Sequence, residues 1–212
     1  MNEGMCLVYK DGTILGQENY IVIDGVTYDL VRREETAGKV GVRLSDIPVS
    51  GTCKIGSHEM IVLEQGEGVT LLLRKDILCK RRFGGTNNFD DSDADGKCKA
   101  FADEIADLVG GENVVEFTVD LTADDGLKCY GSIQRKAALL TANQCRKYVD
   151  ILDEHKLDEW WWTATAYSTP KHGEEDWVKC VSPGGNFGNY DYGRGDGVRP
   201  FCILKSHIFV SV

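Results

Sequence analysis

Trp160-Trp161-Trp162-Thr163-Ala164-Thr165 opens the stretch that decides the fold, and Asp196-Gly197-Val198-Arg199-Pro200 closes it. Between them lies Cys180-Val181-Ser182-Pro183-Gly184-Gly185, surrounded by Tyr, Asn, Ser and Gly residues. Bulky residues at both ends predict a rigid frame. The middle predicts binding loops, since Tyr and Trp supply contact area at low entropic cost while Asn, Ser and Gly adapt to a ligand. The alternative interpretation is a glycine-rich surface connection with ordinary turns.

The chain has 212 residues, enough for one large domain or for one domain with a small appendage. Its hydrophobic content of 42% and charged content of 27% are typical of a soluble globular protein. No apolar run approaches the roughly 20 residues that cross a bilayer, and the first residues lack the pattern of a signal peptide. We therefore expect a protein that is cytoplasmic as synthesised and not inserted in a membrane, with association at a virion or cell surface as an alternative.

The net charge of −10 is concentrated in one segment. Residues 90–125 contain twelve acidic side chains against Lys97 and Lys99, so the rest of the chain is formally neutral. No basic stripe is present to neutralise phosphates, which argues against a nucleic-acid partner.

The eight cysteines form no C-x-x-C pair and match no zinc-binding spacing. Most have apolar neighbours, as Cys202 has in Phe201-Cys202-Ile203-Leu204. The pattern predicts reduced, buried thiols that act as small hydrophobic side chains.

Residues 1–45 predict a small β-rich N-terminal segment. Short apolar runs at 6–9 and 13–15 flank a turn, and Asp24-Gly25 joins the runs 20–23 and 26–30 in a pattern that favours a type I′ hairpin. The charged residues 32–41 predict a linker or an exposed loop.

Residues 46–212 predict a second domain with both helices and strands. Apolar residues recur at helical spacing over 97–109 and over 142–154, where Thr141 is the expected N-cap. Runs at 59–63 and 69–73 predict a hairpin, and residues 123–126 predict a turn. Further strands are expected at 114–121, 180–182, 201–204 and 208–212.

Catalytic and metal-binding motifs are not evident. Asp91-Ser92-Asp93-Ala94-Asp95-Gly96 resembles the first half of a calcium loop, but Ala102 stands at the twelfth position, where a glutamate is needed. Clustered Asp residues also favour a helix start, which is the interpretation we prefer. The four histidines are scattered, and neither a G-x-S-x-G nor a phosphate-binding glycine loop occurs. No catalytic residue, metal or cofactor is therefore predicted.

Four motifs together resemble a known family. They are Phe83-Gly84-Gly85-Thr86-Asn87-Asn88-Phe89, the Trp161-Trp162 pair, the Cys180 to Gly185 segment, and Gly197-Val198-Arg199-Pro200. The combination resembles a group with the C-type lectin fold in bacterial and phage genomes, related to the variable proteins of diversity-generating retroelements. The resemblance covers about residues 52–212. It implies an α+β fold with two helices, adjacent terminal strands and a long irregular ligand-binding face, preceded here by the small β-rich N-terminal segment.

The resemblance also assigns roles to residues. Trp161, Trp162, Val198 and Arg199 match the scaffold. Positions that match the variable, ligand-binding surface are Thr163, Tyr167, Ser168, His172, Asp176, Trp177, Lys179, Asn186, Asn189, Tyr190, Tyr192 and Arg194. The chain lacks Glu-Pro-Asn, Gln-Pro-Asp and Trp-Asn-Asp, so a calcium-bridged sugar site is not supported.

The expected function is non-enzymatic binding of a protein or other macromolecular ligand on a host or target surface, through a surface that a retroelement would diversify. Two alternatives remain open. One is a structural phage or surface component without a specific ligand. The other is a fold like that of formylglycine-generating enzymes, with Cys180 or Cys202 as a reactive thiol. The sequence assigns no oligomeric state.

The order of the residues also leads to two geometric expectations. A short strand at 180–182 between two loops would bring Tyr167, Trp177, Tyr190 and Tyr192 into one aromatic patch, unless these rings pack inward. Arg199 lies in an apolar closing segment, so its guanidinium is expected to be held by several carbonyl or carboxylate acceptors.

Overall fold

The computed structural model describes residues 9–10, 13–14, 20–23, 26–29 and 41–212. The chain divides into two compact units, Met1–Lys39 and Val40–Val212. In the first unit, β1 (Tyr9–Lys10) pairs with β2 (Thr13–Ile14), and β3 (Tyr20–Ile23) pairs with β4 (Val26–Asp29). Both hairpins agree with the sequence pattern. The rest of the strand expected at 6–9 and nearly all of the linker expected at 32–41 lie outside the described residues.

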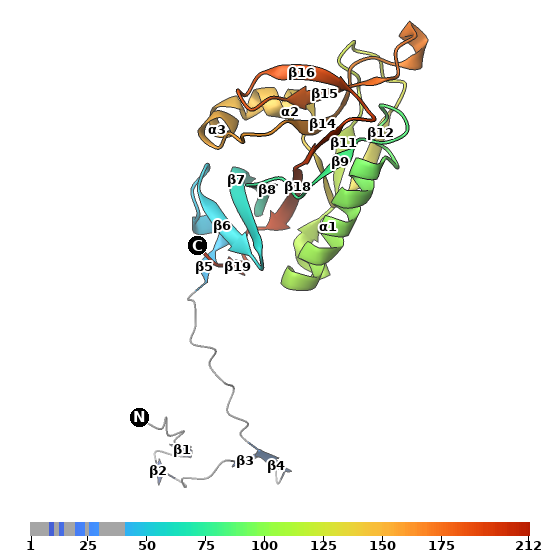
Figure 1. Ribbon diagram of the computed structural model, residues 1–212. Helices are drawn as coiled ribbons and strands as arrows, with labels where there is room; N and C mark the ends of the chain where they lie inside the picture. The colour runs from blue at the N-terminus through green and yellow to red at the C-terminus, as the bar shows by residue number, and fades with distance from the viewer. Residues whose placement is uncertain (1–8, 11–12, 15–19, 24–25, 30–40) are drawn as a thin grey trace. The chain divides into compact units, whose positions relative to one another are not determined.

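The second unit begins with β5 (Val42–Arg43) and ends with β19 (Phe209–Val210), and these two strands pair antiparallel (Figure 1). Its first and last strands are therefore adjacent. The boundary between the units lies a few residues earlier than predicted, because Val42 and Arg43 pair with the end of the second unit.

A six-stranded antiparallel sheet forms one half of the second unit. Its order is β10 (Val114–Val115), β18 (Pro200–Lys205), β8 (Val69–Arg74), β7 (His58–Gly66) and β6 (Thr52–Ile55), and β13 (Ala137–Leu139) also pairs with β18. The β7–β8 hairpin confirms the pattern at 59–63 and 69–73. Alternate residues of a strand face opposite sides, and both sides of β7 are buried: Ile61 packs in one hydrophobic cluster and Val62 in another.

Helix α1 (Asp93–Val109) packs on β13 and β18 of this sheet. It begins four residues before the predicted start at 97, because the Ser92 side chain accepts a hydrogen bond from the Asp95 N–H and caps the helix there. Cys98, Phe101 and Ile105 lie on its buried face. The helix ends at Gly110, whose φ of 88° suits glycine.

The single helix predicted over 142–154 is two helices, α2 (Ala142–Lys147) and α3 (Val149–Glu154). Thr141 caps α2 as predicted, in a capping box with Gln144. The break is at Tyr148, whose backbone (φ −104°, ψ 24°) leaves the helical region while its hydroxyl donates to the Glu64 carboxylate. The described residues thus contain three α-helices, and the fold is α+β. None of these helices is long and apolar enough to cross a membrane.

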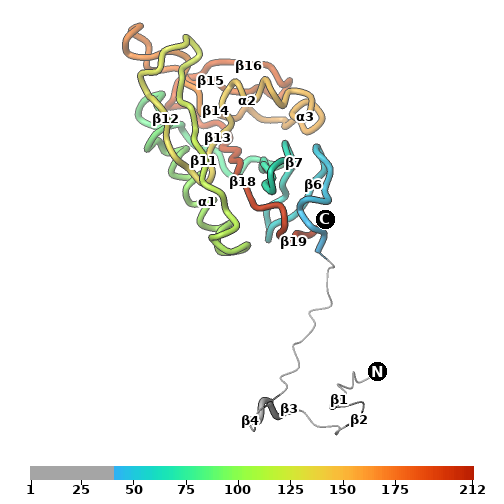
Figure 2. The backbone as a smooth tube through the Cα atoms, turned by 180° about the vertical axis from the view of Figure 1, so that it is seen from behind, coloured from blue at the N-terminus to red at the C-terminus, as the bar shows by residue number. Residues whose placement is uncertain are grey.

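A five-stranded sheet forms the other half. Its order is β16 (Phe187–Asp191), β15 (Trp177–Val181), β14 (Trp161–Ala166), β17 (Gly195–Val198) and β9 (Cys79–Arg82), with only β14 and β17 parallel among these pairs. Helices α2 and α3 lie beside β14–β16 in both views (Figures 1 and 2). Part of the stretch expected to be an irregular face is therefore regular sheet, because five consecutive residues of β15 pair with five of β16.

Two loops lie side by side at one end of this unit (Figures 1 and 2). Residues 121–131 connect β11 (Phe117–Asp120) to β12 (Ser132–Arg135), and residues 167–176 connect β14 to β15. A hydrogen bond from the Asp124 N–H to the carbonyl of Ala166, the last residue of β14, ties the first loop to the start of the second. The strand expected at 114–121 is split, since β10 pairs with β18 whereas β11 pairs with β12.

The four residues assigned to the scaffold are buried. The Trp162 indole donates to the Arg81 carbonyl at 2.9 Å, which joins β14 to β9 across the intervening β17. Gly197 lies where a side chain has no room, because a Cβ there would approach Ile77 Cγ2 to 2.5 Å. The closing motif is thus fixed by packing rather than by a turn.

Candidate ligand-binding surface

The register of β15 and β16 separates the aromatic residues that were expected to form one patch. Trp177 is opposite Asp191, and the next residue, Val178, is opposite Tyr190. Paired residues share a face of the sheet and adjacent residues do not. Trp177 and Tyr190 therefore lie on opposite faces, and the predicted single patch is divided in two.

The first of these faces exposes three aromatic side chains around one lysine. Tyr167, Trp177 and Phe187 are 40%, 41% and 36% exposed, which is high for large apolar residues. Lys179 lies among them, and its Nζ is 5.9 Å from the ring centroids of both Tyr167 and Phe187. We call these four residues the aromatic face. Because Lys179 is 8% exposed, its aliphatic stem is covered and its ammonium has few alternative positions.

A charge network supports the aromatic face from the side. The Asp124 carboxylate accepts from Lys179 Nζ at 3.2 Å and from Arg146 Nη2 at 3.0 Å. Burial raises the pKa of Asp124, but the hydrogen bonds and charges of Arg146 and Lys179 outweigh that effect and lower it overall. The Arg146 guanidinium also lies over the Phe187 ring, 5.1 Å from its centroid. One carboxylate thus holds two cations in place beside the exposed rings.

A polar cavity of about 390 Å³ adjoins the network. It shares Asp124 and Arg146 with that network, and its size is within the range of small-ligand sites. The other residues that line it come from β11, the loop at 121–131, α2 and its N-cap, β14 and β18: Thr118, Val119, Asp120, Thr122, Ala123, Gly126, Thr141, Ala142, Asn143, Gln144, Thr165 and Phe201.

The loop at 167–176 is held by a buried asparagine from a distant segment. Asn87 donates through Nδ2 to the Ser168 and Trp177 carbonyls, both at 3.0 Å. Its N–H donates to the Glu175 carbonyl, and its Oδ1 accepts from the Tyr130 hydroxyl at 2.6 Å. Asn87 is fully buried. Since it contacts both ends of the loop, it fixes the direction in which Trp177 leaves the loop and enters β15.

Three residues expected on the binding surface make hydrogen bonds or ion pairs within the chain. Thr163 is fully buried and donates to the Lys179 carbonyl at 2.8 Å. Ser168 is also buried, and its hydroxyl donates to Asp125 Oδ2 at 2.8 Å. His172 Nδ1 contacts the same oxygen at 3.0 Å, although its ring is exposed. These three residues hold strands and loops together.

The remaining expected residues are distributed over the two faces. Asn189 is opposite Lys179 and therefore lies on the side of the aromatic face, and Asp176 and Asn186 are exposed in the flanking loops. Tyr190, Tyr192 and Arg194 are half-buried. Tyr190 and Arg194 pack together with Trp160 on the other side.

Phe187, Asp124 and Arg146 were not predicted to belong to the site. Phe187 lies between the glycine-rich turn and Gly188. Its place opposite Val181 is known from the strand pairing and not from the sequence. Asp124 and Arg146 were expected to be a turn residue and a helix residue. No spacing pattern relates residues 22 positions apart in the sequence, although their side chains pair.

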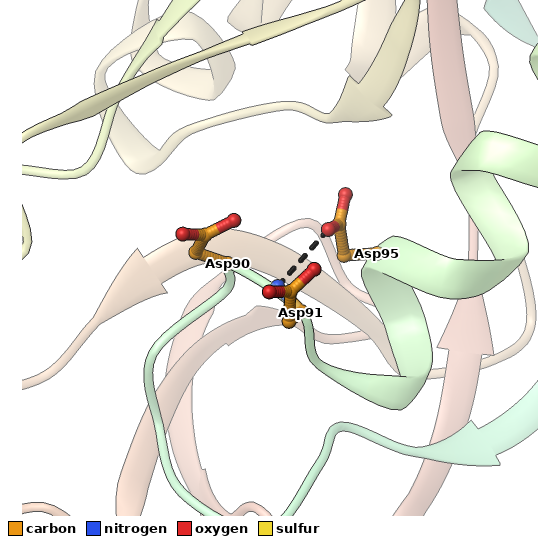
Figure 3. Close-up of side chains that lie close together, drawn as sticks. All are labelled: Asp90, Asp91 and Asp95. Carbon is orange, nitrogen blue, oxygen red and sulfur yellow. Dashed lines mark hydrogen bonds between the residues drawn. The ribbon is translucent and has the colours of Figure 1, made fainter.

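Asp90, Asp91 and Asp95 form an acidic cluster, and two of them, Asp91 and Asp95, belong to the segment that resembles half a calcium loop (Figure 3). A carboxylate oxygen of each lies within 4.8 Å of the others. Asp95 is buried, and it accepts from Arg135 Nε and Nη2, both at 2.8 Å, and from Lys99 Nζ at 2.9 Å. The Asp91 N–H also donates to it. Protein donors thus occupy the buried carboxylate, which favours the helix-start interpretation.

Asp95 predicts a dependence of stability on pH. Burial raises its pKa, but hydrogen bonds from Arg135 and Lys99 lower it overall. A carboxyl group with a lowered folded-state pKa stabilises the protein above its unfolded pKa, and this stabilisation is lost as the pH falls through the folded pKa. We expect the melting-temperature difference between wild type and Asp95→Asn to be constant near neutral pH and to narrow below about pH 4. A difference that stays constant down to about pH 2 would contradict this.

The cysteines in the described part of the chain are all unpaired. Burial raises the pKa of Cys53, Cys145, Cys180 and Cys202 to about 12. Cys129 is an exception to the predicted burial, because it lies exposed in the loop at 121–131. Its environment is a surface loop rather than the core.

Comparisons with known proteins give no match: no family model, no curated protein and no solved structure matches the chain. The site is therefore defined by the geometry of the described residues. Its two parts are the aromatic face and the adjoining cavity, which share the Asp124 network.

Proposed function

We propose that this chain is a non-enzymatic binding protein that engages a protein ligand through the aromatic face. One observation carries the proposal: Tyr167, Trp177 and Phe187 are exposed together around the covered Lys179 on one side of a sheet. Exposed apolar clusters rimmed by polar groups mark interaction surfaces. Binding energy concentrates in aromatic and charged anchors of this kind.

The rigidity of the surface supports the same proposal. Trp177 and Phe187 are on paired strands, and Asn87 holds the loop that positions Tyr167. A preorganised surface loses less conformational entropy on binding than a mobile loop does. The cavity beside Asp124 offers a place for a polar side chain of the ligand.

We propose further that the scaffold is of the C-type lectin kind and that its surface is diversified by a retroelement. Support comes from the four motifs, from the pairing of β5 with β19, and from the helices between them in sequence. Diversification requires positions that tolerate change. Thr163, Ser168 and Lys179 make internal bonds, so the variable set is narrowed to the more exposed positions, such as Tyr167, Trp177 and Asn186.

Site-directed photo-crosslinking tests the proposed function. A benzophenone amino acid at Trp177 should capture a defined partner when the protein is incubated with extracts of candidate target cells or with their surface proteins. The same group at Phe209, which is 64% exposed on β19, is the matched control. Capture at 177 and not at 209 supports the proposal. Equal capture, or none at either position, would contradict it in favour of a structural component without a specific ligand.

Thiol labelling separates binding from the enzyme alternative. Buried thiols of raised pKa are poor nucleophiles, so iodoacetamide should modify Cys129 in the native protein well before Cys180 and Cys202. Peptide mass spectrometry after short exposures measures the order. If Cys180 or Cys202 reacts first, a reactive-thiol enzyme becomes the better account.

A further inference from the structure

A second aromatic cluster lies on the side of β15–β16 opposite the aromatic face. The rings of Trp160 and Tyr190 meet edge to face, with centroids 4.8 Å apart and planes at 85°. The Arg194 guanidinium lies against both rings, 3.5 Å from the Tyr190 centroid and 5.6 Å from that of Trp160. Two aromatic walls at right angles with a cation against them form a cation–π site.

A buried carboxylate completes the cluster. Asp196 is 4% exposed, and its Oδ1 forms an ion pair with Arg194 Nε at 3.1 Å. Within the described part of the chain, Asp196 Oδ2 is buried without a hydrogen-bond partner. Leaving such an acceptor unpaired is costly. Burial raises the pKa of Asp196, and the nearby Arg194 and Lys80 oppose that effect.

Arg194 contacts only one of the two oxygens of the Asp196 carboxylate. A guanidinium can bind a carboxylate through two parallel N–H donors, but Arg194 is two residues from Asp196 in sequence and contacts it through Nε alone. An arginine that approaches from outside the chain is free of that restriction. It can present two donors to both oxygens while its plane stacks on Tyr190.

The backbone around Arg194 does not depend on its side chain. The Arg194 N–H donates to the Asp191 carbonyl at 3.0 Å, and the Gly193 N–H donates to Asp191 Oδ1 at 2.7 Å. Glycines precede and follow Arg194, and its side chain is 37% exposed. The guanidinium can therefore leave the rings by side-chain rotation while this turn keeps its hydrogen bonds.

We propose that Trp160, Tyr190 and Asp196 form a recognition site for a guanidinium group, which Arg194 fills in the free protein and an arginine side chain of a partner fills in the complex. The site is separate from the aromatic face and does not depend on the proposed function. Arg194 acts as an internal competitor, which lowers the apparent affinity by the fraction of molecules in which it occupies the site.

Titration of N-acetyl-arginine amide into wild type and Arg194→Met tests the proposal, with the Trp160 indole NMR signal as the readout. The variant should bind the probe about ten-fold or more tightly than wild type, because the internal competitor is gone. Arg82→Met, which removes an exposed arginine paired with Asp93, should bind like wild type. N-acetyl-lysine amide should bind Arg194→Met more weakly than the arginine probe, since it lacks the planar fork.

Further experiments test whether the guanidinium comes from a protein partner and whether Asp196 is needed to bind it. A Gly/Ser peptide with a central arginine should bind at least as tightly as the free amide if partner proteins are the source. Asp196→Asn in the Arg194→Met background should abolish the gain in affinity for the arginine probe, and Trp177→Ala in that background should leave the gain intact.

Equal probe affinity in wild type and Arg194→Met would overturn the proposal, as would a gain in affinity that survives Asp196→Asn. If Arg194→Met does not fold, Arg194→Gln takes its place. If that variant also fails, an unshifted Trp160 signal in wild type at saturating probe overturns the proposal.

Discussion

Arg199→Ala is expected to lower the melting temperature by roughly 6–12 °C, which corresponds to about 3 kcal/mol in a domain of this size. The side chain is 1% exposed. Its Nε donates to the Arg74 carbonyl at 2.9 Å, and its Nη2 donates to the carbonyls of Lys75 and His155 at 2.8 and 3.3 Å. Truncation leaves those carbonyls without their donor and opens a cavity next to Trp161, whose ring lies under the guanidinium.

The expected acceptors for Arg199 are present, and all of them are carbonyls. Burial lowers the pKa of Arg199 to about 10, so the group is still charged at neutral pH. Arg199→Lys keeps the charge but not the fork of donors and should give an intermediate melting temperature. Arg82→Ala, at an exposed arginine, should change it little. A loss of under about 1 °C for Arg199→Ala would show that the three bonds contribute nothing.

Asn87→Ala is the second change with a large expected effect. It removes three side-chain hydrogen bonds from a fully buried position and leaves the Ser168 and Trp177 carbonyls and the Tyr130 hydroxyl without that partner. We expect a loss of about 2–4 kcal/mol in the free energy of unfolding, measured by urea denaturation. Hydrogen exchange in the loop at 167–176 should rise by more than the global loss of stability requires, since the loop is released locally.

A matched substitution tests whether the loss of any asparagine in the Phe83 to Phe89 motif would have the same effects. Asn88 is the next residue, and its side chain accepts only from the Asp90 N–H at the surface. Asn88→Ala should therefore cost well under about 1 kcal/mol, as most surface changes do. If Asn87→Ala lowers stability without faster exchange in the loop, Asn87 supports the core but does not organise the proposed ligand-binding surface.

Local signals in the sequence predicted much of the fold. The apolar runs at 59–63 and 69–73 are separated by a short polar turn, and this is sufficient to specify the β7–β8 hairpin. Thr141 and Gln144 form the capping box that starts α2. Both features depend on residues close together in the chain, which is why their patterns are visible in the sequence.

Features that depend on distant residues were not predictable in this way. Tyr148, where α2 and α3 are separated, has its side-chain hydrogen-bond partner, Glu64, far away in sequence. The split of the aromatic residues between two faces follows from the register of β15 with β16, where a shift of one residue would reverse every side chain. The position of Trp177 depends on Asn87, which lies in a motif whose spacing gives no sign of that contact.

The most direct test of the central claim is the dissociation constant for the partner captured at position 177, measured by calorimetry for wild type, Trp177→Ala and Phe209→Ala. Both substitutions truncate an exposed aromatic residue, but only Trp177 belongs to the aromatic face. Trp177→Ala is predicted to weaken binding about 30-fold, the equivalent of about 2 kcal/mol, with the melting temperature nearly unchanged. Phe209→Ala is predicted to leave the constant within about two-fold of wild type. Equal constants for the two variants would contradict the assignment of the aromatic face as the ligand-binding surface.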